Sequence, residues 1–79
     1  LGEVRRAIEF YEQQLVIVRE IGDRRGEGSA LGNSALAYEQ LDNRAKAIEL
    51  AQQALAIFEQ IENPNVEKVR RLLKRLQAS

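Results

Sequence analysis

Two related stretches decide the fold of this chain: RAIEFYEQQLVIVREI at residues 6–21 and KAIELAQQALAIFEQI at residues 46–61. They match when the sequence is shifted by 40 residues against itself. The identical pairs are Ala7/Ala47, Ile8/Ile48, Glu9/Glu49, Gln13/Gln53, Leu15/Leu55, Ile17/Ile57 and Ile21/Ile61. A match of this length at a fixed period indicates an internal structural repeat.

Each copy carries an apolar stripe at alternating spacings of three and four residues, which is typical of a helix. The stripe comprises Val4, Ala7, Ile8, Phe10, Tyr11, Leu15, Ile17, Val18 and Ile21 in the first copy, and Ala47, Ile48, Ala51, Leu55, Phe58 and Ile61 in the second. A stripe this wide predicts packing against more than one neighbour. Core packing therefore explains these side chains without a bound cofactor.

Helix-ending signals separate the copies. Gly22 is suited to closing the first helix, and Asp23 or a neighbouring residue can cap the next. Asn63 is predicted to cap the last helix, with Pro64 at its first position. The predicted helices span residues 3–22, 24–40, 44–62 and 64–77. Because the connections are very short, we expect an all-α fold of antiparallel helix–turn–helix repeats, a fragment of an α-solenoid.

The last predicted helix differs from the others. It has one narrow apolar stripe, Val66, Val69, Leu73 and Leu76, and is otherwise mostly polar, as expected for a terminal capping helix. Five of its residues are basic and one is acidic, so residues 66–79 carry +4 and residues 1–65 carry −4. The predictions for this segment are a solvated cap face or an electrostatic contact with an acidic partner or nucleic acid.

Composition narrows the function. The 79 residues contain no Cys and no His, which excludes disulfides, the usual zinc and haem ligand sets, and Cys–His or Ser–His–Asp catalysis. We therefore expect no enzymatic activity, no metal and no cofactor. The formal net charge of zero argues against nucleic-acid binding. No apolar run is long enough to cross a membrane, no signal-peptide pattern is present, and the absence of Cys fits a cytoplasmic location.

Residues 30–61, ALGNSALAYEQLDNRAKAIELAQQALAIFEQI, resemble a tetratricopeptide repeat. Leu31, Ala35 and Tyr38 match the family's large, small and aromatic positions, and Ala47 and Ala54 match the alanines where its helices cross. The sequence departs from the family pattern at Ser34, where Leu is usual, and at Ala51, where an aromatic residue is usual. A HEAT-type repeat has a similar length but lacks this alanine–aromatic pattern.

The 40-residue period exceeds the usual 34 of the family. It is similar to the extended repeats of kinesin light chain and of bacterial, notably cyanobacterial, proteins. The resemblance implies that residues 1–23 form the second helix of a preceding repeat, residues 24–62 one full repeat, and residues 63–79 a C-terminal cap. We expect the chain to lie at the C-terminal end of a larger intracellular protein.

The resemblance also implies a protein or peptide partner, bound on the concave face by the helix at 24–40. Its groove-side residues would be Ser29, Asn33, Leu36, Glu39 and Gln40. In the extended repeats, an Asn at the position of Asn33 can hydrogen-bond the backbone of a bound peptide, because an amide both donates and accepts. A second Asn often follows one turn later, where this chain has Leu36. For Asn33 itself, an ordinary helix-surface or inter-helix hydrogen bond is the alternative.

Two alternatives to peptide binding follow from the same pattern. The chain could be a structural cap or spacer without a ligand. It could also form a homo-oligomer through the first helix, whose broad apolar surface lacks a preceding helix to cover it.

Overall fold

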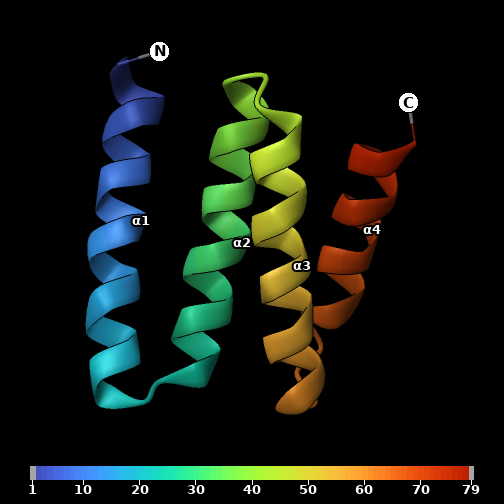
Figure 1. Cartoon of the computed structure of the whole chain (residues 1–79). Helices are drawn as coiled ribbons and strands as arrows, with labels where there is room; N and C mark the ends of the chain where they lie inside the picture. The colour runs from blue at the N-terminus through green and yellow to red at the C-terminus, as the bar shows by residue number, and fades with distance from the viewer. Residues whose placement is uncertain (1, 79) are drawn as a thin grey trace.

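A computed structural model of the chain describes residues 2–78, which form four α-helices (Figure 1). They are α1 (Gly2–Ile21), α2 (Arg24–Gln40), α3 (Arg44–Gln60) and α4 (Val66–Gln77). Successive helices run antiparallel, and each packs on the next. The Cα extents of 31 × 27 × 15 Å describe a slab about one helix pair thick. The all-α fold predicted from the sequence is confirmed.

Small residues hold α3 close to its neighbours. Ala47, Ala51 and Ala54 are completely buried along α3, and Ala35 is completely buried on α2. Such side chains let helix backbones approach closely, while Leu31, Phe58 and the leucines of α4 fill the remaining space. The core lies between α2, α3 and α4, with Leu15 of α1 packed at its edge.

One turn type recurs every 20 residues. Gly22, Asp42 and Glu62 each have a positive φ, at 73°, 62° and 54°. The next residue in each turn donates its backbone N–H to the carbonyl five residues earlier, at 2.8–2.9 Å. This is the Schellman arrangement that closes a helix and reverses the chain. Asp23 and Asn43 then cap α2 and α3 by accepting hydrogen bonds from the N–H groups of Gly26 and Lys46.

The predicted start of the last helix is wrong. Asn63 does not cap a helix that begins at Pro64, because α4 begins at Val66. The Asn63 side chain instead accepts a hydrogen bond from the Asn65 N–H at 2.8 Å, and its carbonyl accepts one from the Val66 N–H at 3.1 Å. These bonds form a separate turn with Pro64 inside it. Likewise α3 ends at Gln60 rather than residue 62, because Ile61 and Glu62 belong to the closing turn.

None of the helices within residues 2–78 combines the length and the hydropathy that a bilayer-crossing segment requires.

Candidate functional site

A groove of about 410 Å³ runs between α2 and α4, above Phe58 of α3. Its α2 wall is made by Gly28, Ser29, Gly32, Asn33 and Leu36. Its opposite wall is made by Asn65, Lys68, Val69, Arg71, Leu72 and Arg75. Three helices therefore build the site, and α2 and α4, which run in the same direction, form its two sides.

Two glycines on the α2 wall lack side chains that would otherwise narrow the groove or displace its floor. Gly28 is buried, and a Cβ placed there would lie 2.6 Å from the Cε1 atom of Phe58. Gly28 therefore lets the Phe58 ring close the bottom of the groove. A Cβ at Gly32 would meet no other atom within 4 Å, because Gly32 faces the open groove. The backbone of α2 is thus accessible along this side.

The structure brings three of the five predicted site residues together in this groove: Ser29, Asn33 and Leu36. They share a helix face because they are spaced by four and three residues. Glu39 lies one turn further along α2 and is held by Arg75. Gln40 is exposed and does not line the groove.

Arg75 and Glu39 join α4 to α2 at one end of the groove. Arg75 donates two hydrogen bonds to the carboxylate, from Nη2 at 2.7 Å and from Nε at 3.2 Å. These hydrogen bonds, and then the attraction of the opposite charges, raise the pKa of Arg75. The interaction is bidentate, which fixes the orientation of both side chains.

The α4 wall of the site was not predicted from the sequence. The basic composition of this helix is visible in the sequence, but which of its cations face a groove is not. Lys68, Arg71 and Arg75 are spaced by three and four residues, so they share one flank of α4. Arg70 lies on the other flank, where it pairs with Glu59 of α3 and Glu67. The spacing of Lys68, Arg71 and Arg75 along the predicted helix was the signal that could have grouped them on one flank.

A buried carboxylate stabilises the start of α2, away from the groove. Glu27 accepts hydrogen bonds at 2.9 Å from Arg19 of α1 and from Arg24. Arg24 also donates to the side chain of Gln60 on α3. Glu27 is therefore paired on both oxygens and joins α1 to α2, while Arg24 links α2 to α3. Within residues 2–78, no cluster of three or more acidic side chains is arranged to hold a metal ion.

A family model described as tetratricopeptide repeat matches residues 1–60. The chain belongs to the tetratricopeptide repeat family. The match ends at the last residue of α3, so α4 lies beyond the matched tetratricopeptide segment. Searches of curated proteins and of solved structures returned no match.

Membership of the tetratricopeptide repeat family carries a general function. Tetratricopeptide repeats mediate protein–protein interaction, bind protein partners and are typically non-enzymatic. The helices α2 and α3 are joined by a tight turn and pack against each other as a helix–turn–helix pair. The groove beside α2 is therefore the candidate site at which a partner would bind.

Proposed function

We propose that this chain is an interaction module that holds a peptide segment of another protein in the groove between α2 and α4. The observation that carries this proposal is the convergence of Ser29, Asn33 and Leu36 on one groove of about 410 Å³. That volume falls within the range of about 300–1,000 Å³ usual for binding pockets.

The chemistry of the α2 wall suits an extended peptide. Asn33 is exposed, and its side chain forms no hydrogen bond within residues 2–78. Its amide is therefore available to donate to a peptide carbonyl and accept from a peptide N–H. Ser29 adds a hydroxyl one turn away, and Gly32 lets the peptide approach the α2 backbone.

Filling the groove would test this proposal. The Cβ of a Gly32→Phe side chain would meet no neighbouring atom, so the ring would occupy the groove, and Gly32→Ala is the matched control. Peptides selected from a random displayed library on the wild-type chain should bind Gly32→Ala and lose affinity for Gly32→Phe. In NMR spectra, the backbone amide chemical shifts that change on peptide binding should cluster at Ser29, Asn33 and Lys68. If no selected peptide is sensitive to Gly32→Phe, groove binding is rejected.

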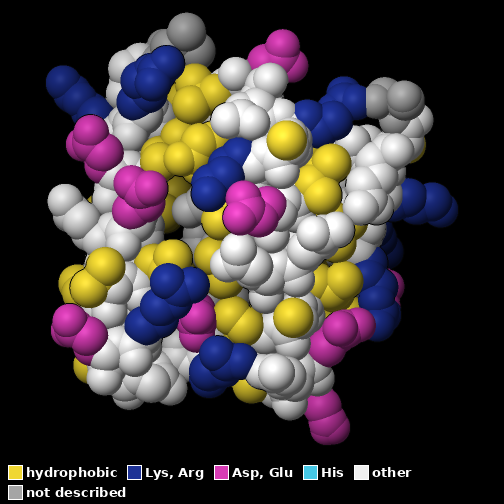
Figure 2. Space-filling model, in the orientation of Figure 1, with side chains coloured by type: hydrophobic (Ala, Val, Ile, Leu, Met, Phe, Trp, Pro, Cys, Tyr) yellow, Lys and Arg dark blue, Asp and Glu magenta, His cyan; other side chains and the backbone are white. Residues whose placement is uncertain are grey.

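A second candidate function, self-association through α1, rests on a comparison between repeat copies. Phe10 and Ile17 on α1 are 55% and 49% exposed, whereas their equivalents on α3, Leu50 and Ile57, are 8% and 6% exposed. The difference arises because α3 packs between two helices, while α1 packs extensively on α2 alone. Hydrophobic side chains accordingly come to the surface along α1 (Figure 2). Phe10, Ile17 and Ile21 share a face by helical spacing.

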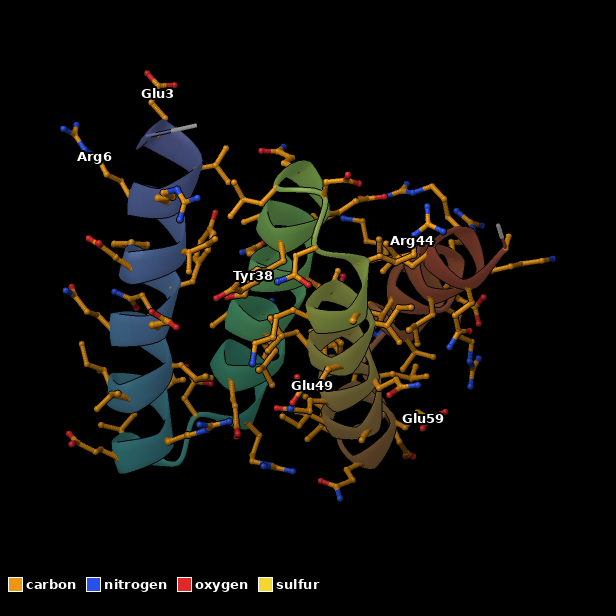
Figure 3. The ribbon with its side chains drawn as sticks, turned by 45° about the horizontal axis from the view of Figure 1, so that its top comes forward. Glu3, Arg6, Tyr38, Arg44, Glu49 and Glu59 are labelled. Atoms are coloured by element: carbon orange, nitrogen blue, oxygen red, sulfur yellow. The ribbon has the colours of Figure 1, made fainter. Side chains whose placement is uncertain are left out.

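The charges beside this stripe favour an antiparallel pair of α1 helices from two copies. Arg6 and Glu20 are both exposed and lie on the same flank of the stripe. Arg6 projects away from α2 (Figure 3). In an antiparallel pair centred near Gln13, Arg6 of one copy would face Glu20 of the other while Phe10 would face Ile17. A two-fold pair would form both contacts twice.

Sedimentation across a range of protein concentrations would test the pairing. We expect a dimer that dissociates in the Phe10→Ser/Ile17→Ser variant and is retained in Val16→Ser, which removes an exposed residue from another side of α1. A wild-type chain that stays monomeric at the highest concentration rejects the pairing.

We further infer a division of the chain into residues 1–23 as the second helix of one repeat, 24–62 as a full repeat and 63–79 as a cap. The 40-residue period and the polar outer face of α4 support this division. The same period supports similarity to the extended repeats of kinesin light chain and bacterial proteins. A cytoplasmic location, which we also infer, is consistent with the absence of Cys. A spacer without a ligand is the outcome if both binding tests fail.

A further inference from the structure

The charge of the groove is one-sided. Among residues 2–78, three basic side chains line it, Lys68, Arg71 and Arg75, and no acidic side chain does. This differs from the whole chain, which has 12 basic and 12 acidic residues and no net charge. The fold therefore concentrates positive charge at a particular surface of a neutral molecule.

Two of these cations have no acidic partner. Within the described part of the chain, Lys68 and Arg71 are exposed and form no ion pair. Arg70 pairs outside the groove, and Arg75 pairs with Glu39 at one end. The two cations without an ion pair among residues 2–78 therefore lie between Arg75 and the other end of the groove, where Asn65 and Ser29 lie.

An apolar surface lies between the cations and α2. Leu36 is 43% exposed on the α2 side, and Val69 and Leu72 line the α4 side. The groove therefore offers three kinds of contact to one ligand: cations from α4, apolar side chains from both walls, and the polar groups of Ser29 and Asn33.

We propose that the groove selects an acidic peptide segment, with carboxylates against Lys68 and Arg71 and an apolar side chain beside Leu36. This inference rests on the proposed function and adds the chemistry of the partner. The carboxylates would supply the charge that Lys68 and Arg71 lack within the chain, and Asn33 would bind the peptide backbone. Opposite charges at an exposed rim chiefly provide selectivity and fast association.

A single-stranded nucleic acid fits the groove less well, although it too is anionic. Such ligands are held by exposed aromatic side chains that stack on the bases. The only aromatic residue lining the groove among residues 2–78 is Phe58, which is 2% exposed at its base. A flexible acidic side chain can reach the cations without a stacking surface.

Matched peptides and matched charge variants test the proposal. The probes are short synthetic peptides with Asp and Glu on either side of a central Leu, and the same peptides with Asn and Gln in place of the acids. The groove variant is Lys68→Glu/Arg71→Glu. Its control, Arg5→Glu/Lys74→Glu, makes the same change in net charge at exposed positions that do not line the groove. Thermal unfolding of both variants confirms that they fold.

We expect the acidic peptides to bind the wild type and the control, and to lose about tenfold or more in affinity for the groove variant. Binding should weaken as salt is raised, and the amide peptides should bind more weakly than the acidic ones. Equal affinity of acidic and amide peptides, or equal affinity for the two charge variants, would overturn the proposal.

The library selection separates this failure from failure of the proposed function. Library peptides that are lost on Gly32→Phe but carry no acidic excess would overturn the acidic preference and leave groove binding intact. Loss of all groove-dependent binders would overturn both. An oligo-dT probe that binds through Lys68 and Arg71 while the acidic peptides do not would assign the groove to nucleic acid and overturn the proposal.

Discussion

Gly28 of α2 lies directly against the ring of Phe58 of α3, with no room for a side chain between them. Phe58 is 2% exposed and belongs to the core, so its ring is closely packed by its neighbours. Both residues also line the groove. The closeness of α2 and α3 and the shape of the candidate site therefore depend on the same contact.

Gly28→Ala should destabilise the fold. The new Cβ would lie 2.6 Å from Phe58, and relieving this clash requires the ring or α2 to shift. Overpacking of this kind costs about 1–3 kcal/mol, which outweighs the gain of about 1 kcal/mol from replacing a helical Gly by Ala. Urea unfolding of the variant and the wild type measures the difference.

Gly32→Ala is the matched comparison, one turn along the same helix. Its Cβ meets nothing within 4 Å, so only the helix-propensity gain remains. We expect this variant to be more stable than the wild type by about 1 kcal/mol in the same urea measurement. Equal effects at Gly28 and Gly32 would contradict the contact between Gly28 and Phe58.

Glu27→Gln should weaken the junction of α1 with α2. The amide keeps the size of the side chain but removes the charge that Arg19 and Arg24 share. Because Glu27 is buried, we expect a loss of about 1–3 kcal/mol of unfolding free energy. Glu49→Gln, at an exposed carboxylate that pairs with Lys46, should change stability by less than about 0.5 kcal/mol in the same assay.

The three equivalent turns predict opposite effects of glycine substitutions. Gly22→Ala places a Cβ at φ 73° and should cost about 1 kcal/mol, whereas Glu62→Gly removes a side chain from φ 54° and should stabilise by about 1 kcal/mol. Asp42→Gly should have a smaller effect, because Asp tolerates the left-handed region better. Thermal unfolding can rank the three variants. A destabilised Glu62→Gly would show that its side chain, and not its backbone conformation, dominates.

The helix caps predict a further contrast. Asp23→Ala removes the hydrogen bond from Gly26 at the start of α2 and should cost about 1 kcal/mol. Asn65→Ala removes no side-chain cap bond and should leave the free energy of unfolding within about 0.5 kcal/mol of wild type. Chemical denaturation checks both. A large effect of Asn65→Ala would indicate that its side chain stabilises α4 by another contact.

Local sequence signals predicted the helices well but not every helix end. The apolar periods and the Gly22–Asp23 pair located α1 and α2 to within one residue, because caps and turns act over only a few residues. The prediction at Asn63 and Pro64 was wrong because an Asn can bond either to a helix N–H or to the N–H two residues on. The sequence pattern is the same in both cases.

The sequence by itself determined the 40-residue repeat, the order of four antiparallel helices and the resemblance to tetratricopeptide repeats. It also placed Ser29, Asn33 and Leu36 on one helix face, since that depends on helical spacing alone. Only the tertiary structure decided that Lys68 and Arg71 face these residues across a groove. It also decided that the Phe58 ring packs against Gly28, whereas the space beside Gly32 is empty. The physical reason is that these features depend on how α2 and α4 pack against α3, which involves contacts between residues far apart in the chain.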